Sequence, residues 1–426
     1  MKPDIFYGWY IVGVSFLSYI AQSFALSSTL SVFLKPLTHD LGVSRGIFSL
    51  VRTGEVLIFA ALSPTIGHLV DHHGPRVPMA LGALVASVGF LLLSQVQNFW
   101  YFALIRWLPL TIGDAFMGYL VVNVTLSRWF IRKRGRVIAL ANLGTGVTKI
   151  SVPLVAASLF VWIGWRYTWA VFGILTLLLI VGPAWVFMRR RPEDMGLHPD
   201  GAAEPYYSGT SSGSDSGLSA TQRQALQADV VWTRGEALRT STFWLLVITF
   251  GIASVGVTGM NLHAFAYVTD IGYPTIIAAS VMSVMAFTQV CSNLFWGFVA
   301  ERIDLRKAAA VQFLVQAGGL ALAISTNDLA LVYVGFFFYG TGLGGSFVLR
   351  ETIWPNYFGR LSLGTVRGMG LLITLILSAG GAPFFGFLFD ATSSYLTPFT
   401  IFIGALLLST ILISLVRPPK KPGAAA

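Results

Sequence analysis

The chain has 426 residues, of which 55% are hydrophobic and 11% are charged, and its mean hydropathy is +0.73. Soluble proteins carry about 25% charged residues, and one soluble domain of this length could not bury so much apolar surface. The composition argues against a soluble enzyme, a nucleic-acid-binding domain and a disordered chain. It predicts a polytopic membrane protein in contact with the lipid bilayer.

Twelve apolar runs are each long enough to cross a bilayer as a helix, which takes about 20 residues. Their approximate ranges are 8–34, 46–70, 78–97, 99–127, 136–161, 166–188, 242–269, 275–300, 307–326, 329–355, 364–389 and 395–416. The runs are continuous and do not alternate with period two, so they indicate helices and not a membrane barrel. We predict an all-α integral membrane protein with twelve transmembrane helices in two six-helix, pseudo-symmetric bundles.

The basic residues predict the orientation of these spans. The formal charge is +10, and most of the 28 Lys and Arg residues fall in segments that are cytoplasmic when the N-terminus is inside. Only Lys35, Arg45 and Arg166 lie in the opposite segments. This asymmetry predicts that both termini are cytoplasmic, in a bacterial cytoplasmic membrane.

One polar stretch divides the chain. Residues 208–219 are rich in Ser and Gly, which is typical of a flexible linker. We expect an N-terminal six-helix bundle at 1–188, a cytoplasmic linker at 189–241, and a C-terminal six-helix bundle with a short cytoplasmic tail at 242–426.

The two halves share a loop pattern. Gly67, three further residues and Asp71 follow span two, and Gly297, three further residues and Glu301 follow span eight, each with basic residues beyond. Two similar six-span halves are the architecture of a transporter whose substrate binds near the midplane. Charges beside these glycines predict cytoplasmic locks, and the gating candidates are Gly67, Asp71, Arg76, Glu301, Arg302 and Glu351.

These motifs resemble the major facilitator superfamily over nearly the whole chain. Gly67 to Arg76 is similar to its signature loop between spans two and three, with His72 in place of the usual basic residue. Arg106, followed by Gly113 and Gly118 in span four, resembles its second signature. The resemblance implies the major facilitator fold, alternating access and a role for Arg106 in proton coupling.

Within that superfamily the chain is most similar to the monocarboxylate porter and oxalate/formate antiporter group. The residues that carry this resemblance are Tyr7-Gly8-Trp9, Phe33-Leu34-Lys35, Gly74-Pro75-Arg76 and Arg128-Trp129-Phe130. That group usually has a carboxylate-binding arginine in span eight, often with an acid one turn earlier. This chain has Asn293 and Gln289 there, which puts simple lactate-type or oxalate-type transport in doubt.

Charged residues inside spans are functional candidates because each costs about 2.5–3.5 kcal/mol on insertion scales. Arg52 and Glu55 are three residues apart and share a helix face. Arg52 either binds an anionic substrate, with Glu55 as a proton carrier, or the two form a permanent structural salt bridge. In span ten, Arg350 is a candidate for substrate binding, whereas Glu351 is more readily explained as a gate.

Further candidates have both a functional and a structural interpretation. Asp114 is either a proton carrier or a buried structural acid, and His263 is either a titrating group or a packing residue. Lys35 either lies beside the pathway or is an interfacial lysine. Asn261, Asn293, Tyr119 and Tyr339 complete the predicted substrate-binding set, while Glu55, Asp114, His263 and Arg106 form the predicted proton-coupling set.

Together these features predict a secondary active transporter of a small organic anion, a mono- or dicarboxylate, that is coupled to protons. The alternatives are an organic-anion exchanger without proton coupling and a multidrug exporter of amphipathic compounds. The sequence has no enzyme signature and no phosphate-binding loop, so it predicts neither an enzyme nor an ATP-driven pump. We expect no cofactor, no metal site and no nucleic-acid partner, and we expect a monomer.

Overall fold

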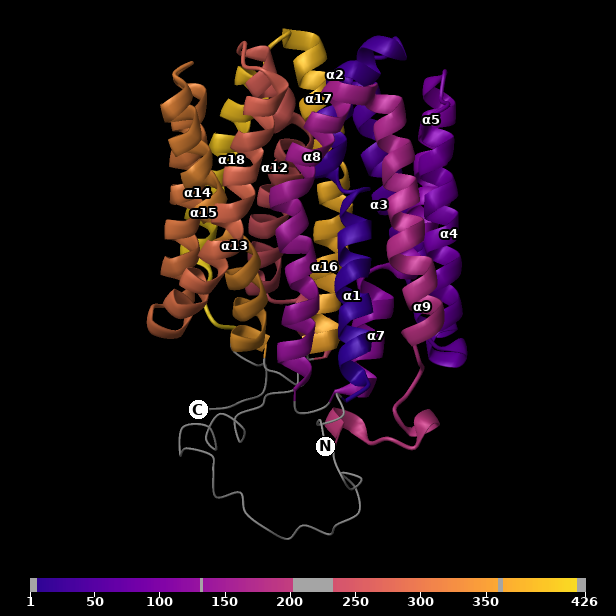
Figure 1. The fold of residues 1–426 in the computed structure, drawn as a ribbon. Coiled ribbons are helices and arrows are strands. Elements are labelled where there is room, and N and C mark those ends of the chain that lie inside the picture. Colours follow the sequence, from indigo (N-terminus) through magenta and orange to yellow (C-terminus); the bar gives the residue numbers. More distant parts are fainter. Residues whose placement is uncertain (1–5, 131–132, 202–232, 359–362, 420–426) are drawn as a thin grey trace, which may run out of the picture. The chain divides into compact units, whose positions relative to one another are not determined.

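In a computed structural model of the chain, residues 6–130, 133–201, 233–358 and 363–419 are described, and these residues form helices and no strand (Figure 1). In the first half the elements are α1 (Gly8–Ser23), α2 (Ser27–Asp40), α3 (Arg45–His73), α4 (Arg76–Leu93), α5 (Phe99–Ile105), η1 (Arg106–Leu110), α6 (Thr111–Met117), α7 (Tyr119–Trp129), α8 (Arg134–Thr176), η2 (Leu177–Val181), α9 (Gly182–Phe187), η3 (Glu193–Met195) and η4 (Pro199–Gly201).

The second half is built from longer, less interrupted helices. Its elements are α11 (Arg234–Leu238), α12 (Ser241–Asp270), α13 (Thr275–Arg302), α14 (Leu305–Ile324), α15 (Leu329–Phe358), α16 (Leu363–Ala379), α17 (Gly381–Thr392) and α18 (Leu396–Leu415). The short helix α11 begins with a capping box, in which Thr233 and Glu236 satisfy each other's backbone N–H groups.

Within the described residues, ten helical stretches are long and apolar enough to cross a membrane. One of them, Arg136–Phe187, has 52 residues and contains both the fifth and the sixth predicted spans. The predicted second span, which carries Arg52 and Glu55, is covered by α3. A helix therefore covers each of the twelve spans predicted from the sequence.

Several predicted spans are interrupted. The first divides into α1 and α2 around Phe24, and the fourth breaks at Gly118, where α6 ends and α7 begins. Gly164 separates the fifth and sixth spans with φ 77°, a left-handed conformation that residues with a Cβ rarely adopt. These breaks matter because they leave backbone groups open to contacts from other helices.

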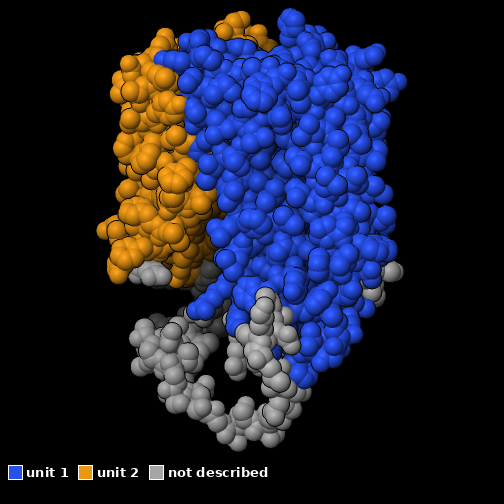
Figure 2. Space-filling view, in the orientation of Figure 1, with its two compact units in different colours: residues 1–210, 261–283 blue, residues 211–260, 284–426 orange. Residues whose placement is uncertain are grey.

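The chain divides into two compact units (Figure 2). Unit 1 comprises residues 1–210 and 261–283, and unit 2 comprises residues 211–260 and 284–426. The stretch 261–283, which holds the end of α12 and the start of α13, thus groups with the first half of the chain. The predicted domains place that stretch in the C-terminal bundle.

Each unit has its own dense packing. In unit 1 the buried Trp169 ring lies 4.4 Å from Phe33 and 5.8 Å from Phe90, measured between ring centroids. In unit 2, α14 and α15 approach closely at Gly319 and Gly335, where a Cβ atom would collide with the facing backbone. Small residues at such crossings are a common device of membrane helices.

We predict that Gly164→Ala lowers the free energy of unfolding by about 1–2 kcal/mol, because alanine must adopt φ 77° with ψ 166° there, a backbone conformation that is essentially restricted to glycine. A Cβ atom at this position meets nothing within 4 Å, so the loss reports backbone strain alone. Unfolding by SDS in mixed micelles measures it. Gly404→Ala is the matched control, since Gly404 is helical with equally open space, and it should not destabilise. Equal behaviour of the two variants would contradict the prediction.

Candidate functional site

Glu55 lies between two arginines in unit 1. Arg52 donates from Nη1 to Glu55 Oε2 at 2.5 Å, and Arg106 donates from Nε to Glu55 Oε1 at 2.6 Å. Arg106 also donates from Nη2 to the carbonyl of Ala25 at 2.9 Å, in the break between α1 and α2. The side chains of Arg106 and Glu55 are 1% and 7% exposed. We call Arg52, Glu55 and Arg106 the Glu55 cluster.

The local sequence explains how Arg106 reaches Glu55. Gly54 precedes the glutamate, and a Cβ atom there would collide with the indole of Trp107. The indole instead donates to the carbonyl of Val51 at 2.9 Å, which fastens η1 against α3. Pro109, which has no N–H, lies within the π-helical turn η1, and prolines commonly disturb the helical hydrogen-bond pattern in this way.

The charges of Glu55 and Arg106 in the Glu55 cluster are buried, so each must be paired to offset the free-energy cost of leaving water. An ionised group without a partner is costly in a low-dielectric interior, and a buried pair is tolerated when both partners are well placed. One carboxylate against two guanidinium groups leaves the cluster with one excess positive charge. The same-face spacing predicted for Arg52 and Glu55 is present, and the participation of Arg106 is an addition that the sequence did not indicate.

Asp114 brings a second acid close to this cluster. Gln22 on α1 donates from Nε2 to Asp114 Oδ2 at 3.3 Å, while the buried Oδ1 has no hydrogen-bond partner among the described residues. Arg52, Arg106 and Glu55 are near enough to act electrostatically on the Asp114 carboxyl group. When Asp114 is ionised, two acids balance two arginines.

Arg350 lines a pocket in unit 2. The pocket is partly open to the surroundings, and its lining residues are Phe250, Arg350, Glu351, Trp354, Gly370, Leu371 and Thr374. The Arg350 Nε atom lies 3.8 Å from Glu351 Oε1, and the guanidinium is 5.7 Å from the centre of the Phe347 ring. The pocket therefore combines one cation, one acid and two aromatic rings, Phe250 and Trp354.

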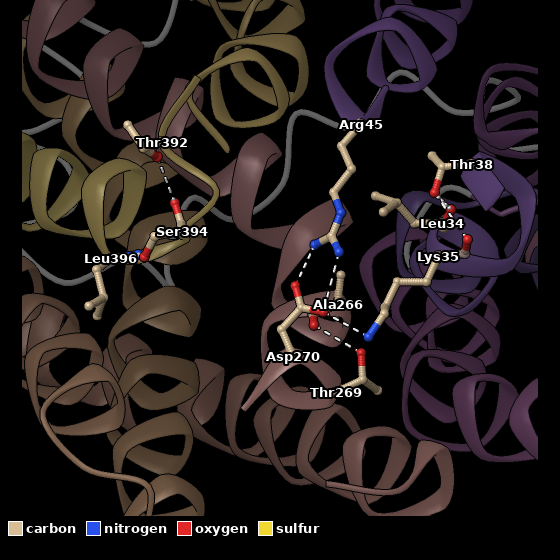
Figure 3. Close-up of polar contacts among 10 residues, drawn as sticks. All are labelled: Leu34, Lys35, Thr38, Arg45, Ala266, Thr269, Asp270, Thr392, Ser394 and Leu396. Carbon is tan, nitrogen blue, oxygen red and sulfur yellow. Dashed lines mark hydrogen bonds and ion pairs between the residues drawn. The ribbon is translucent and has the colours of Figure 1, made fainter. Parts of the chain in front are cut away.

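A third group of charges joins α2, α3 and α12 in unit 1. Figure 3 shows Lys35 and Arg45 pointing at Asp270, the last residue of α12. Lys35 Nζ lies 2.7 Å from Asp270 Oδ1, and Arg45 makes two contacts with the carboxylate, at 2.5 Å and 3.2 Å. We call Lys35, Arg45 and Asp270 the Asp270 cluster. Lys35, a predicted substrate residue, is thus held by an acid that the sequence did not single out.

Two predicted residues lie on the same part of α12. His263 is fully buried, and its Nε2 atom is 3.0 Å from the hydroxyl of Ser49 on α3. Asn261 is half-buried two residues earlier. The histidine is therefore packed between α3 and α12, in contact with a serine hydroxyl.

The other predicted substrate residues each have local contacts. Asn293 donates to the carbonyls of Gln289 and Gly344 at 3.1 Å when its amide is oriented to satisfy both. Tyr119 is 45% exposed and packs against Phe59. Tyr339 is fully buried where α14 and α15 meet.

The predicted gating residues fall into two groups. The contacts of Gly67, Asp71 and Glu301 are not among those described, although α3 and α13 continue through these residues. Arg76 lies over the Trp185 ring at 4.6 Å, and Arg302 lies over the Phe298 ring at 3.4 Å.

The loop after α13 has a local charge pair. Asp304 caps α14, and Arg306 donates to its carboxylate at 2.9 Å and 3.1 Å. The Arg306 side chain holds the pKa of Asp304 down at about 2, so the acid is ionised at all physiological pH values. Among the described residues, no group of three or more His, Cys, Asp or Glu side chains is arranged to hold a metal ion.

A family model and the curated relatives of this chain all point to the same class of protein, membrane transporters. Residues 11–288 match the family model of the Major Facilitator Superfamily. The oxalate:formate antiporter of Oxalobacter formigenes is 26% identical, over 92% of this chain and 88% of that protein. Monocarboxylate transporter 4 of Rattus norvegicus is 23% identical, over 97% of this chain and 83% of that protein.

A solved structure shows the same fold. It is that of a bacterial homologue of the human lysosomal transporter Spinster, in an inward-facing and unoccupied conformation. The TM-score is 0.72 at 15% sequence identity, and the match covers 98% of this chain and 96% of the other. Two six-helix bundles are therefore the fold of this multi-pass membrane protein.

We predict that Glu55→Gln destabilises the protein by about 3–5 kcal/mol, because it leaves the buried Arg106 without a counter-charge. The free energy of unfolding in mixed micelles is the measurement. Glu351→Gln is the matched control, since Glu351 is 44% exposed and 3.8 Å from its arginine, and it should lose less than about 1 kcal/mol. If both variants lose the same amount, Glu55 is not the counter-charge described above.

We predict that Asp270→Asn speeds backbone hydrogen exchange at the end of α12, because the helix loses its charged contacts with Lys35 and Arg45. An increase of about 5- to 30-fold corresponds to about 1–2 kcal/mol of local stability. Asp328→Asn is the control, since asparagine is an equally good helix cap at that position. Unchanged exchange in the Asp270 variant would refute the role of this cluster.

Proposed function

We propose that this chain, which belongs to the Major Facilitator Superfamily of membrane transporters, carries a small organic anion across the membrane by alternating access. A mono- or dicarboxylate is the substrate class that fits best. The relatives named above are an oxalate:formate antiporter and a monocarboxylate transporter, and both names refer to carboxylates.

The observation that carries this proposal is the position of Arg350. Arg350 lines a pocket with Phe250 and Trp354, so a cationic residue lies beside two aromatic side chains. Arginine offers a rigid fork of donors that matches a carboxylate, and such charge-assisted pairs are strong where water is excluded. A small organic acid presents the complementary pair of surfaces, a carboxylate and a short carbon skeleton.

The contacts of the other candidate residues support Arg350 as the carboxylate-binding residue. Arg52 and Arg106 are already bonded to Glu55, and Asn293 occupies the place where related porters have an arginine in span eight. Asn293 donates to backbone carbonyls and carries no charge. We therefore assign the carboxylate contact to Arg350 on α15, which lines the pocket with Phe250 and Trp354.

We further propose that transport is coupled to protons through Asp114. With Asp114 ionised, its charge and that of Glu55 balance Arg52 and Arg106. A proton on Asp114 removes one negative charge and leaves this group of side chains in unit 1 with a net positive charge. Proton and carboxylate then bind together, which is the basis of symport.

The transport assay uses proteoliposomes and labelled mono- and dicarboxylates. We predict that Arg350→Gln lowers uptake about 10- to 100-fold, because it removes a charge-assisted hydrogen bond to the substrate. Arg234→Gln is the control, since Arg234 is exposed on α11, and it should transport normally. Full uptake by the Arg350 variant would overturn the site assignment.

The same assay tests the coupling. Dissipating the pH gradient should abolish concentrative uptake. Uptake that stays concentrative without the gradient identifies an exchanger of anions and contradicts proton coupling.

A further inference from the structure

Two hydrogen bonds connect buried charged side chains with the break between α1 and α2 or with the helical turn just before it. Arg106 donates to the carbonyl of Ala25 within the break, at 2.9 Å. Gln22, in the last turn of α1, donates to Asp114 at 3.3 Å. A span can bend where its helix is interrupted. Both hydrogen bonds therefore lie where the direction of α2 relative to α1 can change.

The chain leaves space for the contact between Gln22 and Asp114. A Cβ atom on Gly118 would lie 2.5 Å from Gln22 Nε2 and 2.6 Å from the carbonyl oxygen of Asp114. Any other residue at this position would therefore press on the amide. Gly118 lies between the end of α6 at Met117 and the start of α7 at Tyr119, so the fourth span breaks shortly after Asp114.

The Asp114 carboxyl group depends on this amide. Its Oδ1 atom is buried without a hydrogen-bond partner among the described residues, and Oδ2 accepts from Gln22. The charged groups that face it are Arg52 and Glu55 from α3 and Arg106 from η1. On α4, Gly82 and Ala86 pack against Gly113 of α6, and both are uncharged.

We propose that Gln22 is a positioning residue that transmits the protonation state of Asp114 to the break between α1 and α2. This inference rests on the proposed role of Asp114 as the proton carrier. An amide suits the task because it has both a donor and an acceptor. Its Nε2 group donates to the carboxylate, and after rotation its Oε1 atom accepts from the neutral carboxyl group.

The transmission has a physical route. Beyond the break, α2 carries Lys35, whose Nζ atom lies 2.7 Å from Asp270. A change in the direction of α2 therefore alters one ion pair of the Asp270 cluster. Through Gln22, protonation of Asp114 therefore affects the contact between α2 and α12.

The test compares the pH dependence of labelled carboxylate counterflow for wild type and Gln22→Leu. Loss of the amide N–H destabilises the Asp114 carboxylate, so the group keeps its proton at higher pH. The midpoint of the pH profile should shift upward by about one pH unit, with the KM for the carboxylate unchanged. Gln95→Leu is the matched control, because Gln95 is exposed in the turn after α4, and its profile should equal that of wild type.

A second comparison separates positioning from packing. In an Asp114→Asn background, the carboxyl group is absent and Gln22→Leu should cause no further shift. Gln22→Met, which has an unbranched side chain of similar length, replaces the leucine variant if that protein does not fold.

The outcomes are distinguishable. A wild-type profile in folded Gln22→Leu or Gln22→Met protein overturns the role of Gln22, as does a further shift in the Asp114→Asn background. A raised KM with an unshifted midpoint also overturns it and places Gln22 in contact with substrate. Absence of carboxylate counterflow in wild type refutes the proposed function itself.

Discussion

The carboxylate of Glu55 is the group on which the arrangement of unit 1 depends. Two arginines inside an apolar bundle repel each other and lose their hydration, and Glu55 compensates both with contacts of 2.5 Å and 2.6 Å. Because Arg106 also holds the carbonyl of Ala25, the cluster ties together α3, η1 and the interrupted first span. The electrostatic setting of Asp114 follows from this network.

Much of the fold follows from the sequence because long apolar runs leave few other possibilities. Each of the twelve predicted spans is helical, and lipid requires backbone groups to be satisfied within a segment. The breaks were harder to predict. The first span was expected to be one helix over 8–34, and its division around Phe24 depends on polar contacts from residues distant in sequence.

The candidate site was predictable only where its residues are close in sequence. The spacing of Arg52 and Glu55 places them on one helix face, whereas Arg106 reaches Glu55 because Gly54 admits the indole of Trp107. No local pattern links Gln22 with Asp114. Asp270 at the end of α12 resembles any interfacial acid until Lys35 and Arg45 are brought to it.

In the proposed mechanism the two units divide the work, with carboxylate binding at Arg350 in unit 2 and the proton response at Asp114 in unit 1. The most direct measurement compares proteoliposome uptake of a labelled monocarboxylate with that of its uncharged primary amide, which has nearly the same shape. If the pocket selects for negative charge, the proteoliposomes take up the carboxylate and do not take up the amide. Equal entry of the two compounds, or entry of the amide alone, would contradict recognition of an anion by Arg350.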